Sequence, residues 1–219
     1  MCFSATASFA TSGALAASAV AIARVPKPKS AVPLALFPAI FAVLQFAEGL
    51  LWLNHRGFVD EAWKPPALYV FLLIAYVLWP VYVPFSAYLL EKGRRRRLVI
   101  LLCQAAGLVV GFWNLAVIIR GPVDAWVIGH SFHYQIAMPG GLNAPYVIAV
   151  MVPFLVNRRW RLAVFGVALA ILYGIAALVA ASDTFPSVWC FYAAILSVFL
   201  YLIFRYRGKG GVTAFGPRD

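Results

Sequence analysis

Residues 31–54 read AVPLALFPAIFAVLQFAEGLLWLN. The run is long enough to cross a membrane, since a spanning helix needs about 20 predominantly apolar residues. One charged side chain, Glu48, is set well inside it, whereas the other charged residues lie in connecting segments or at the edge of an apolar run. A carboxylate in hydrocarbon is costly and persists mostly where it faces a cavity, a partner, an ion or a substrate. The stretch therefore predicts a membrane helix and a functional position within it.

The rest of the chain has the same character. Of its 219 residues, 64% are hydrophobic and 11% are charged, against about half and about a quarter in soluble domains. This composition predicts a multi-pass membrane protein with one transmembrane domain, residues 1–206, and a flexible, basic cytoplasmic tail at 207–219. The net charge of +11 does not indicate a nucleic-acid partner, because the basic residues cluster in short loops between apolar runs. The predicted partner is the lipid bilayer.

Hydropathy predicts an all-α bundle of seven transmembrane helices. Six is the alternative count, because the fifth run is short and contains Pro145 and Pro153. The predicted spans are residues 5–23, 31–54, 66–90, 98–119, 144–157, 162–182 and 186–204.

The distribution of Lys and Arg predicts the orientation, since short cytoplasmic loops carry an excess of both. All of the 18 basic residues except Arg56, Lys64 and Arg120 fall on one side of the seven-span arrangement. The clusters of Lys and Arg follow the first, third, fifth and seventh predicted spans. This pattern predicts an N-terminus outside and a C-terminus in the cytoplasm.

With this orientation, Glu48 lies six residues before Asn54, roughly 9 Å beneath the outer boundary at 1.5 Å per residue. Gln45, Glu48, Trp52 and His55 are spaced 3, 4 and 3 and share one helix face. That face is polar and aromatic, so we expect it to point into the bundle. There Glu48 is a candidate general acid or base. The alternative is a buried carboxyl that serves only hydrogen bonds between helices.

Other polar residues fall in the same outer half of the predicted bundle. Gln45, Trp52, Asn114 and Asp183 are candidate ligand-binding residues of a cavity open to the outer face. The alternative is that these groups only satisfy one another between helices.

The longest connection follows the fourth span and contains WVIGHSFHYQI at residues 126–136. The β-rich runs on either side of Gly129-His130-Ser131 predict a hairpin over the outer mouth. His130 and His133, together with Glu48, are candidate ligands for zinc or another divalent metal. The alternative is two solvated or interfacial histidines.

Cys2 is a second candidate catalytic residue. Removal of Met1 would leave an N-terminal cysteine, whose amine and thiol together can chelate a metal or act as a nucleophile. The alternatives are a small buried thiol or a lipidated one.

Several cofactors are excluded by what the sequence lacks. A retinal Schiff base needs a lysine inside the last span, but Lys209 lies beyond it. Haem between helices would need histidines within spans, and none is present. The glycine-rich loops of nucleotide-binding proteins are also missing. We therefore expect no retinal, haem or nucleotide.

The opening MCFSATASF at residues 1–9, together with QFAEGLLW at 45–52, resembles a family of bacterial multi-pass proteins of about this length and unknown function. The resemblance implies a bacterial inner membrane and places Cys2, Gln45, Glu48 and Trp52 in the family pattern. It implies no activity. A weaker, architectural similarity is to seven-span zinc hydrolases such as alkaline ceramidases and progestin/adiponectin receptors. Those proteins use three histidines as zinc ligands. This chain has no well-placed third histidine.

Two functional hypotheses follow. In the first, the chain is a membrane-embedded, metal-dependent enzyme that hydrolyses a lipid or another amphiphile at the outer face. In the second, it binds, senses or transports a small ligand, with Glu48 as the binding carboxylate. A structural subunit of a membrane complex is the third possibility.

Overall fold

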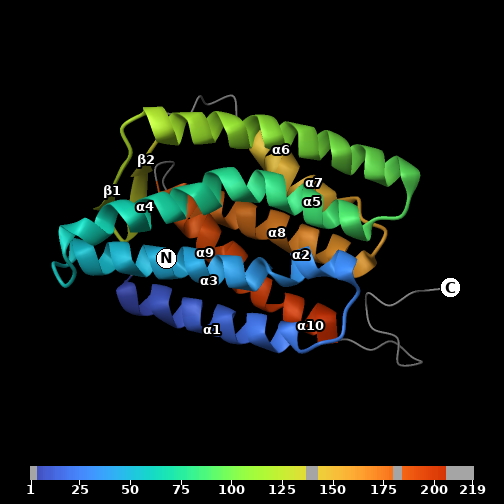
Figure 1. Cartoon of the computed structure of the whole chain (residues 1–219), viewed down its shortest axis with the longest axis horizontal. Helices are drawn as coiled ribbons and strands as arrows, with labels where there is room; N and C mark the ends of the chain where they lie inside the picture. Colours follow the sequence, from blue (N-terminus) through green and yellow to red (C-terminus); the bar gives the residue numbers. More distant parts are fainter. Residues whose placement is uncertain (1–3, 137–142, 180–183, 206–219) are drawn as a thin grey trace.

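Apolar helices run side by side and a β-hairpin covers one end of the bundle (Figure 1). The structure is a computed structural model that describes residues 4–136, 143–179 and 184–205. Its helices are α1 (Ala5–Ala23), α2 (Val32–Ala35), α3 (Phe37–His55), α4 (Lys64–Leu72), α5 (Trp79–Leu90), α6 (Arg94–Arg120), α7 (Asn143–Leu155), α8 (Trp160–Val179), α9 (Phe185–Val198) and α10 (Leu200–Arg205). A π-helical segment, η3 (Leu73–Leu78), joins α4 to α5, and 3-10 turns lie at Lys29–Ala31 and Glu61–Trp63.

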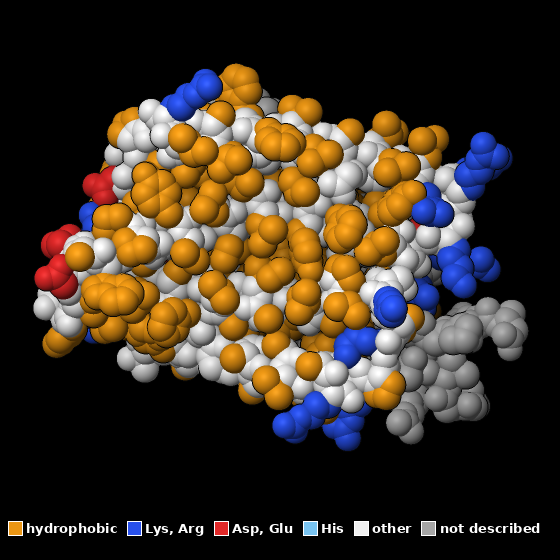
Figure 2. All heavy atoms as spheres, in the orientation of Figure 1, with side chains coloured by type: hydrophobic (Ala, Val, Ile, Leu, Met, Phe, Trp, Pro, Cys, Tyr) orange, Lys and Arg blue, Asp and Glu red, His pale blue; other side chains and the backbone are white. Residues whose placement is uncertain are grey.

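Six helical stretches are long and apolar enough to cross a membrane within the described part of the chain. They are Ala5–Ala23, Lys29–His55, Glu61–Leu90, Arg94–Arg120, Trp160–Val179 and Ser187–Arg205. Large apolar side chains cover the visible flank of the bundle (Figure 2), and Val109 and Phe112 are 64% and 68% exposed. These features fit an integral multi-pass membrane protein.

The fifth predicted span is the shortest of the helices expected to cross. Helix α7 has 13 residues, or roughly 20 Å of length, against a hydrocarbon thickness of about 30 Å. Residues 137–142, which precede it, lie outside the described residues. Helix α7 packs against α5, α6 and α8.

Helix α3 lies at the centre of the bundle, with α1 and α9 against it. Small residues allow α1 to approach closely. The Ser12 hydroxyl donates a hydrogen bond to the Ala42 carbonyl at 2.8 Å. At Gly49, an added Cβ would lie 2.8 Å from the Phe9 ring. Close contact through Gly, Ala and Ser is how membrane helices commonly pack without a hydrophobic driving force.

The π-helical segment exposes backbone carbonyls inside the bundle because Pro80 has no N–H to donate. Asn114 on α6 donates from Nδ2 to the Tyr76 carbonyl at 2.9 Å. The Tyr146 hydroxyl on α7 donates to the Ala75 carbonyl at 2.6 Å. Side chains of two neighbouring helices thus replace the missing backbone donor, as irregular membrane helices require.

Gly107 and Gly111 let α6 lie directly on this irregular segment. An added Cβ at Gly107 would come within 1.8 Å of the Pro80 carbonyl oxygen. At Gly111 it would lie 2.9 Å from the Val81 side chain. The spacing is that of the small-residue motif through which membrane helices approach one another.

Strands β1 (Asp124–Ile128) and β2 (Ser131–Gln135) form the predicted hairpin. Gly129 takes φ 61° at the first position of the two-residue turn, which a turn with glycine first requires. Ala125 pairs with Tyr134, and Trp126 pairs with His133. Because side chains alternate along a strand, Phe132 and Tyr134 share the buried face and His133 lies on the other.

Charge separates the two ends of the bundle. Most Lys and Arg side chains lie at the end opposite the hairpin, and acidic side chains appear at the hairpin end (Figure 2). At the hairpin end, Lys64 Nζ pairs with Asp124 Oδ1 at 2.8 Å.

Candidate functional site

Glu48 is completely buried in the C-terminal half of α3, near the hairpin. The Ser187 hydroxyl on α9 donates to its Oε1 at 2.5 Å. The Tyr134 hydroxyl on β2 donates to the same oxygen at 3.3 Å. Gln45 Nε2, one turn earlier on α3, donates to Oε2 at 3.4 Å. Three neutral donors therefore converge on one carboxyl group, which is how a buried charge is kept hydrogen-bonded.

These donors join three separate elements at one point. Tyr134 and Ser187 lie 86 and 139 residues from Glu48 along the chain. Ser187 is fully buried, as is Gln45, and Tyr134 is buried on the inner face of the hairpin. The carboxyl group therefore fastens the hairpin and α9 to the central helix.

Aromatic packing holds the hairpin in place around this contact. Tyr134 stacks on Phe71 with ring centroids 4.1 Å apart and planes 9° apart. Trp52, one turn after Glu48, meets Phe132 edge-on at 4.7 Å. The inner face of the hairpin thus acts as a cover over Glu48.

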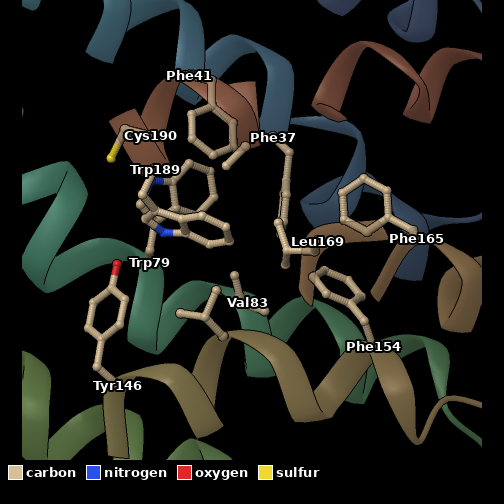
Figure 3. Close-up of a pocket in the computed structure, with 12 residues that line it drawn as sticks. Phe37, Phe41, Trp79, Val83, Tyr146, Phe154, Phe165, Leu169, Trp189 and Cys190 are labelled. Atoms are coloured by element: carbon tan, nitrogen blue, oxygen red, sulfur yellow. The ribbon is translucent and has the colours of Figure 1, made fainter. Parts of the chain in front are cut away.

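An aromatic chamber lies deeper in the bundle, and Glu48 is not among its lining residues (Figure 3). Its lining residues are Phe37, Phe41, Trp79, Val83, Tyr146, Val150, Phe154, Phe165, Leu169, Trp189, Cys190 and Ala193. Its volume of about 20 Å³ is enough for about one water molecule. The chamber is therefore nearly closed in this structure.

Helical spacing connects the chamber to the carboxyl group. Phe41 lies about two turns before Glu48 on α3, and Cys190 lies about one turn after Ser187 on α9. The walls of the chamber come from α3, α5, α7, α8 and α9, so the two helices that carry the Glu48–Ser187 contact also contribute to its lining.

Trp79 gives the chamber both an aromatic surface and a polar atom. Its indole stacks on Phe41 with centroids 4.2 Å apart. Trp79 Nε1 is buried and has no hydrogen-bond partner in the described part of the chain. The chamber therefore holds an unpaired N–H donor as well as aromatic faces.

The predicted ligand-binding residues divide into three groups. Gln45 and Trp52 lie beside Glu48, as expected from their shared face. Asn114 is instead fully buried and bonds to the Tyr76 carbonyl, so its role here is to satisfy the π-helical segment. Asp183 and the candidate catalytic residue Cys2 lie outside the described residues.

The structure does not bring His130 and His133 to Glu48. His133 stacks against Trp126 at 4.4 Å on the outer face of the hairpin, because strand alternation gives the inner position to Tyr134. His130 lies in the exposed turn. No group of three His, Cys, Asp or Glu side chains suited to a metal ion forms within the described ranges. The structure thus does not form the predicted grouping of Glu48 with both histidines, and metal binding stays a prediction.

Two residues of the site were missed by sequence reasoning. The position of Tyr134 can be predicted from the hairpin, because side chains alternate along a strand and residues 132 and 134 therefore share one face. Ser187 is one of two serines in its apolar run, and its spacing from Cys190 is the only local signal. Neither spacing predicts which helix the hydroxyl faces.

The model of a protein family described as a family of unknown function (DUF6629) matches residues 1–214. The chain belongs to this family. Membership confirms the resemblance seen in the opening residues and in the QFAEGLLW stretch. No curated protein and no solved structure matches the chain. The likeness to seven-span zinc hydrolases and the bacterial origin stay predictions.

Proposed function

We propose that the chain is a membrane-embedded binding protein for a small organic cation, with Glu48 as the binding carboxylate. The observation that carries this proposal is a buried carboxyl group on α3, the helix that also contributes Phe37 and Phe41 to an aromatic chamber. Aromatic faces attract cations through their quadrupoles, most strongly where water is excluded. A carboxylate beside such faces adds the opposite charge. An amine or quaternary ammonium group matches both.

Binding requires the chamber to open, because its present volume of about 20 Å³ holds about one water molecule. The Tyr134 hydroxyl forms the longer of the two bonds to Glu48 Oε1, at 3.3 Å against 2.5 Å for Ser187. An entering cation would replace Tyr134 at the carboxylate and release the hairpin. This exchange couples occupancy to hairpin position and favours sensing over continuous transport.

For the arrangement in the membrane, we propose seven crossings with the N-terminus outside and the hairpin on the outer face. The segregation of Lys and Arg toward the opposite end supports this orientation (Figure 2). The six helices of spanning length, with the shorter α7 as the seventh crossing, support the count. The site then lies in the outer half of a cytoplasmic membrane.

Thermal unfolding of the purified protein tests the binding proposal. Tetramethylammonium is expected to raise the midpoint, because a ligand that binds only the folded state stabilises it. Uncharged neopentyl alcohol, of similar shape, is expected to raise it much less. Glu48→Gln should remove the difference between the two probes.

Glu91→Gln is the matched control. Glu91 is also buried, at 3% exposure, but it lies at the opposite end and accepts hydrogen bonds from backbone amides. The control should keep the response to tetramethylammonium. Equal responses to the charged and uncharged probes, or an unchanged response in Glu48→Gln, would refute the proposal.

A hydrolase acting on a lipid or amphiphile is the second candidate, and the Ser187–Glu48 contact favours it. A serine hydroxyl 2.5 Å from a carboxyl oxygen has a partner that can accept its proton during nucleophilic attack. Turnover of a fluorogenic phospholipid that is lost in Ser187→Ala would support it. Ser197→Ala, a buried serine on the same helix, is the control that should retain turnover.

The metal-dependent form of this second candidate is tested separately. A stoichiometric ion in the purified protein that is lost in both Glu48→Ala and His133→Ala would support the metal-dependent form. An ion-free wild-type protein would refute the metal-dependent form and leave the serine form standing.

A further inference from the structure

A basic cleft lies at the end of the bundle opposite the hairpin, where α5 turns into α6. Its volume is about 640 Å³. Four cationic side chains line it, Lys92, Arg94, Arg95 and Arg97, together with the apolar surfaces of Tyr88, Leu98 and Leu101. The cleft therefore places a cluster of positive charge directly above an apolar wall.

The acidic residue nearest in sequence does not neutralise this cluster. Glu91 is 3% exposed. Its carboxylate accepts hydrogen bonds from the backbone amides of Lys92 at 2.9 Å, Gly93 at 2.7 Å and Arg158 at 2.6 Å. None of the four cations forms an ion pair with a residue that the structure describes. The ion pair between described residues joins Lys64 to Asp124 at the hairpin end. The positive charge is thus available to a ligand.

Arg97 and the first turn of α6 are the parts of the cleft that suit an anion. The Arg97 guanidinium lies over the Tyr88 ring, 4.2 Å from its centroid, and this contact holds the side chain against α5. Arg97 Nε is buried without a hydrogen-bond partner among the described residues. The first backbone N–H groups of α6 also receive no side-chain cap from Gly93, and such groups favour negative charge.

We propose that this cleft binds the headgroup of an anionic phospholipid. The phosphate would lie between Arg94 and Arg97 at the start of α6, and an acyl chain would follow Leu98 and Leu101 along the helix. Charge and position favour this ligand, because the basic residues stand where an apolar helix leaves the hydrocarbon. Basic pockets at this depth are suited to lipid phosphates. The site is separate from Glu48 and does not depend on the function proposed for it.

Native mass spectrometry of the full-length protein in an uncharged detergent tests the proposal. Phosphatidylglycerol is expected to bind more tightly than phosphatidylcholine with the same acyl chains. In Arg94→Gln/Arg97→Gln, the affinity for phosphatidylglycerol should fall on the order of tenfold. The single variant Arg95→Gln, at an exposed position, should show a smaller loss and provides a second measurement if the double variant does not fold.

Arg24→Gln/Lys29→Gln is the matched control, since it removes the same charge from exposed side chains that do not line the cleft. Its affinity should stay within about twofold of wild type. Equal losses in both double variants would show a general charge effect and overturn the proposal. Equal binding of the two lipids would overturn it as well. Displacement of the lipid by millimolar inorganic phosphate would show a site for free phosphate instead.

Discussion

Glu48 accepts hydrogen bonds from a tyrosine and a serine that are 86 and 139 residues away in sequence. Its shared face with Gln45 and Trp52 is predictable, because helical spacing fixes it. Its two hydroxyl partners are not, because they depend on how distant elements pack. The placement of His133 does not follow from helical spacing either, because one residue of strand register decides whether His133 or Tyr134 faces the carboxyl group.

Tyr134→Phe isolates the hydroxyl contact at this site. The variant keeps the ring that stacks on Phe71 and removes only the donor to Glu48. We expect a loss of about 1 kcal/mol in the free energy of unfolding, with faster hydrogen exchange across residues 124–135. Tyr69→Phe, at a tyrosine that is 41% exposed, should leave both quantities unchanged. An equal effect in the two variants would contradict the proposed contact.

At the level of elements, the π-helical segment η3 accounts for two polar side chains on its neighbours, Asn114 and Tyr146. Pro80 and Pro84 predict a bend, but the π-helical turn and its partners depend on α6 and α7. Asn114 was assigned to a ligand site because it is polar and membrane-embedded. In the structure, it donates to the Tyr76 carbonyl. A polar residue opposite a proline in the neighbouring helix is thus as readily structural as functional.

Gly107→Ala tests the contact between α5 and α6. Its Cβ would fall 1.8 Å from the Pro80 carbonyl oxygen, so the helices must separate. We expect a loss of about 1–3 kcal/mol in the free energy of unfolding. In Gly174→Ala, nothing lies within 4 Å of the added Cβ, and this control should be neutral or slightly stabilising. A stable Gly107→Ala variant would contradict the close approach.

The ion pair between α4 and the hairpin predicts a dependence on pH. The hydrogen bond from Lys64 holds the pKa of Asp124 below its ordinary value of 3.8. Because the pKa of Asp124 is lower in the folded state than in the unfolded state, the ion pair stabilises the fold fully above the unfolded-state pKa. It disappears as the pH falls through the folded pKa. The side chains are 31% and 51% exposed, so solvent screening limits the contribution to about 0–1 kcal/mol.

Asp124→Asn measures this contribution directly. The variant should be slightly less stable than wild type at neutral pH and equal to it in strong acid. A difference that persists unchanged in acid would show that the ion pair is not its source.

At the scale of the whole molecule, the sequence predicts the helical bundle well, because apolar runs and basic loops encode it directly. Six of the predicted spans correspond to helices of spanning length, and the fifth corresponds to the shorter α7. The hairpin also follows from its sequence, since Gly129 marks the turn. The arrangement around α3 does not follow, because uniformly apolar helices carry little information about which neighbour they face.

Cysteine labelling tests the orientation proposed for the bundle. In a variant without native cysteines, Glu61→Cys and Arg96→Cys place one exposed thiol at each end. A membrane-impermeant maleimide should label Glu61→Cys in intact cells and Arg96→Cys only after permeabilisation. The reverse pattern would invert the orientation.

Calorimetric titration of tetramethylammonium into the purified protein tests most directly whether Glu48 is a binding carboxylate. We predict saturable binding of one cation per chain in the wild type and in Glu91→Gln, and no measurable binding in a folded Glu48→Gln variant. Saturable binding of the same affinity in Glu48→Gln, or no binding in the wild type, would contradict the assignment.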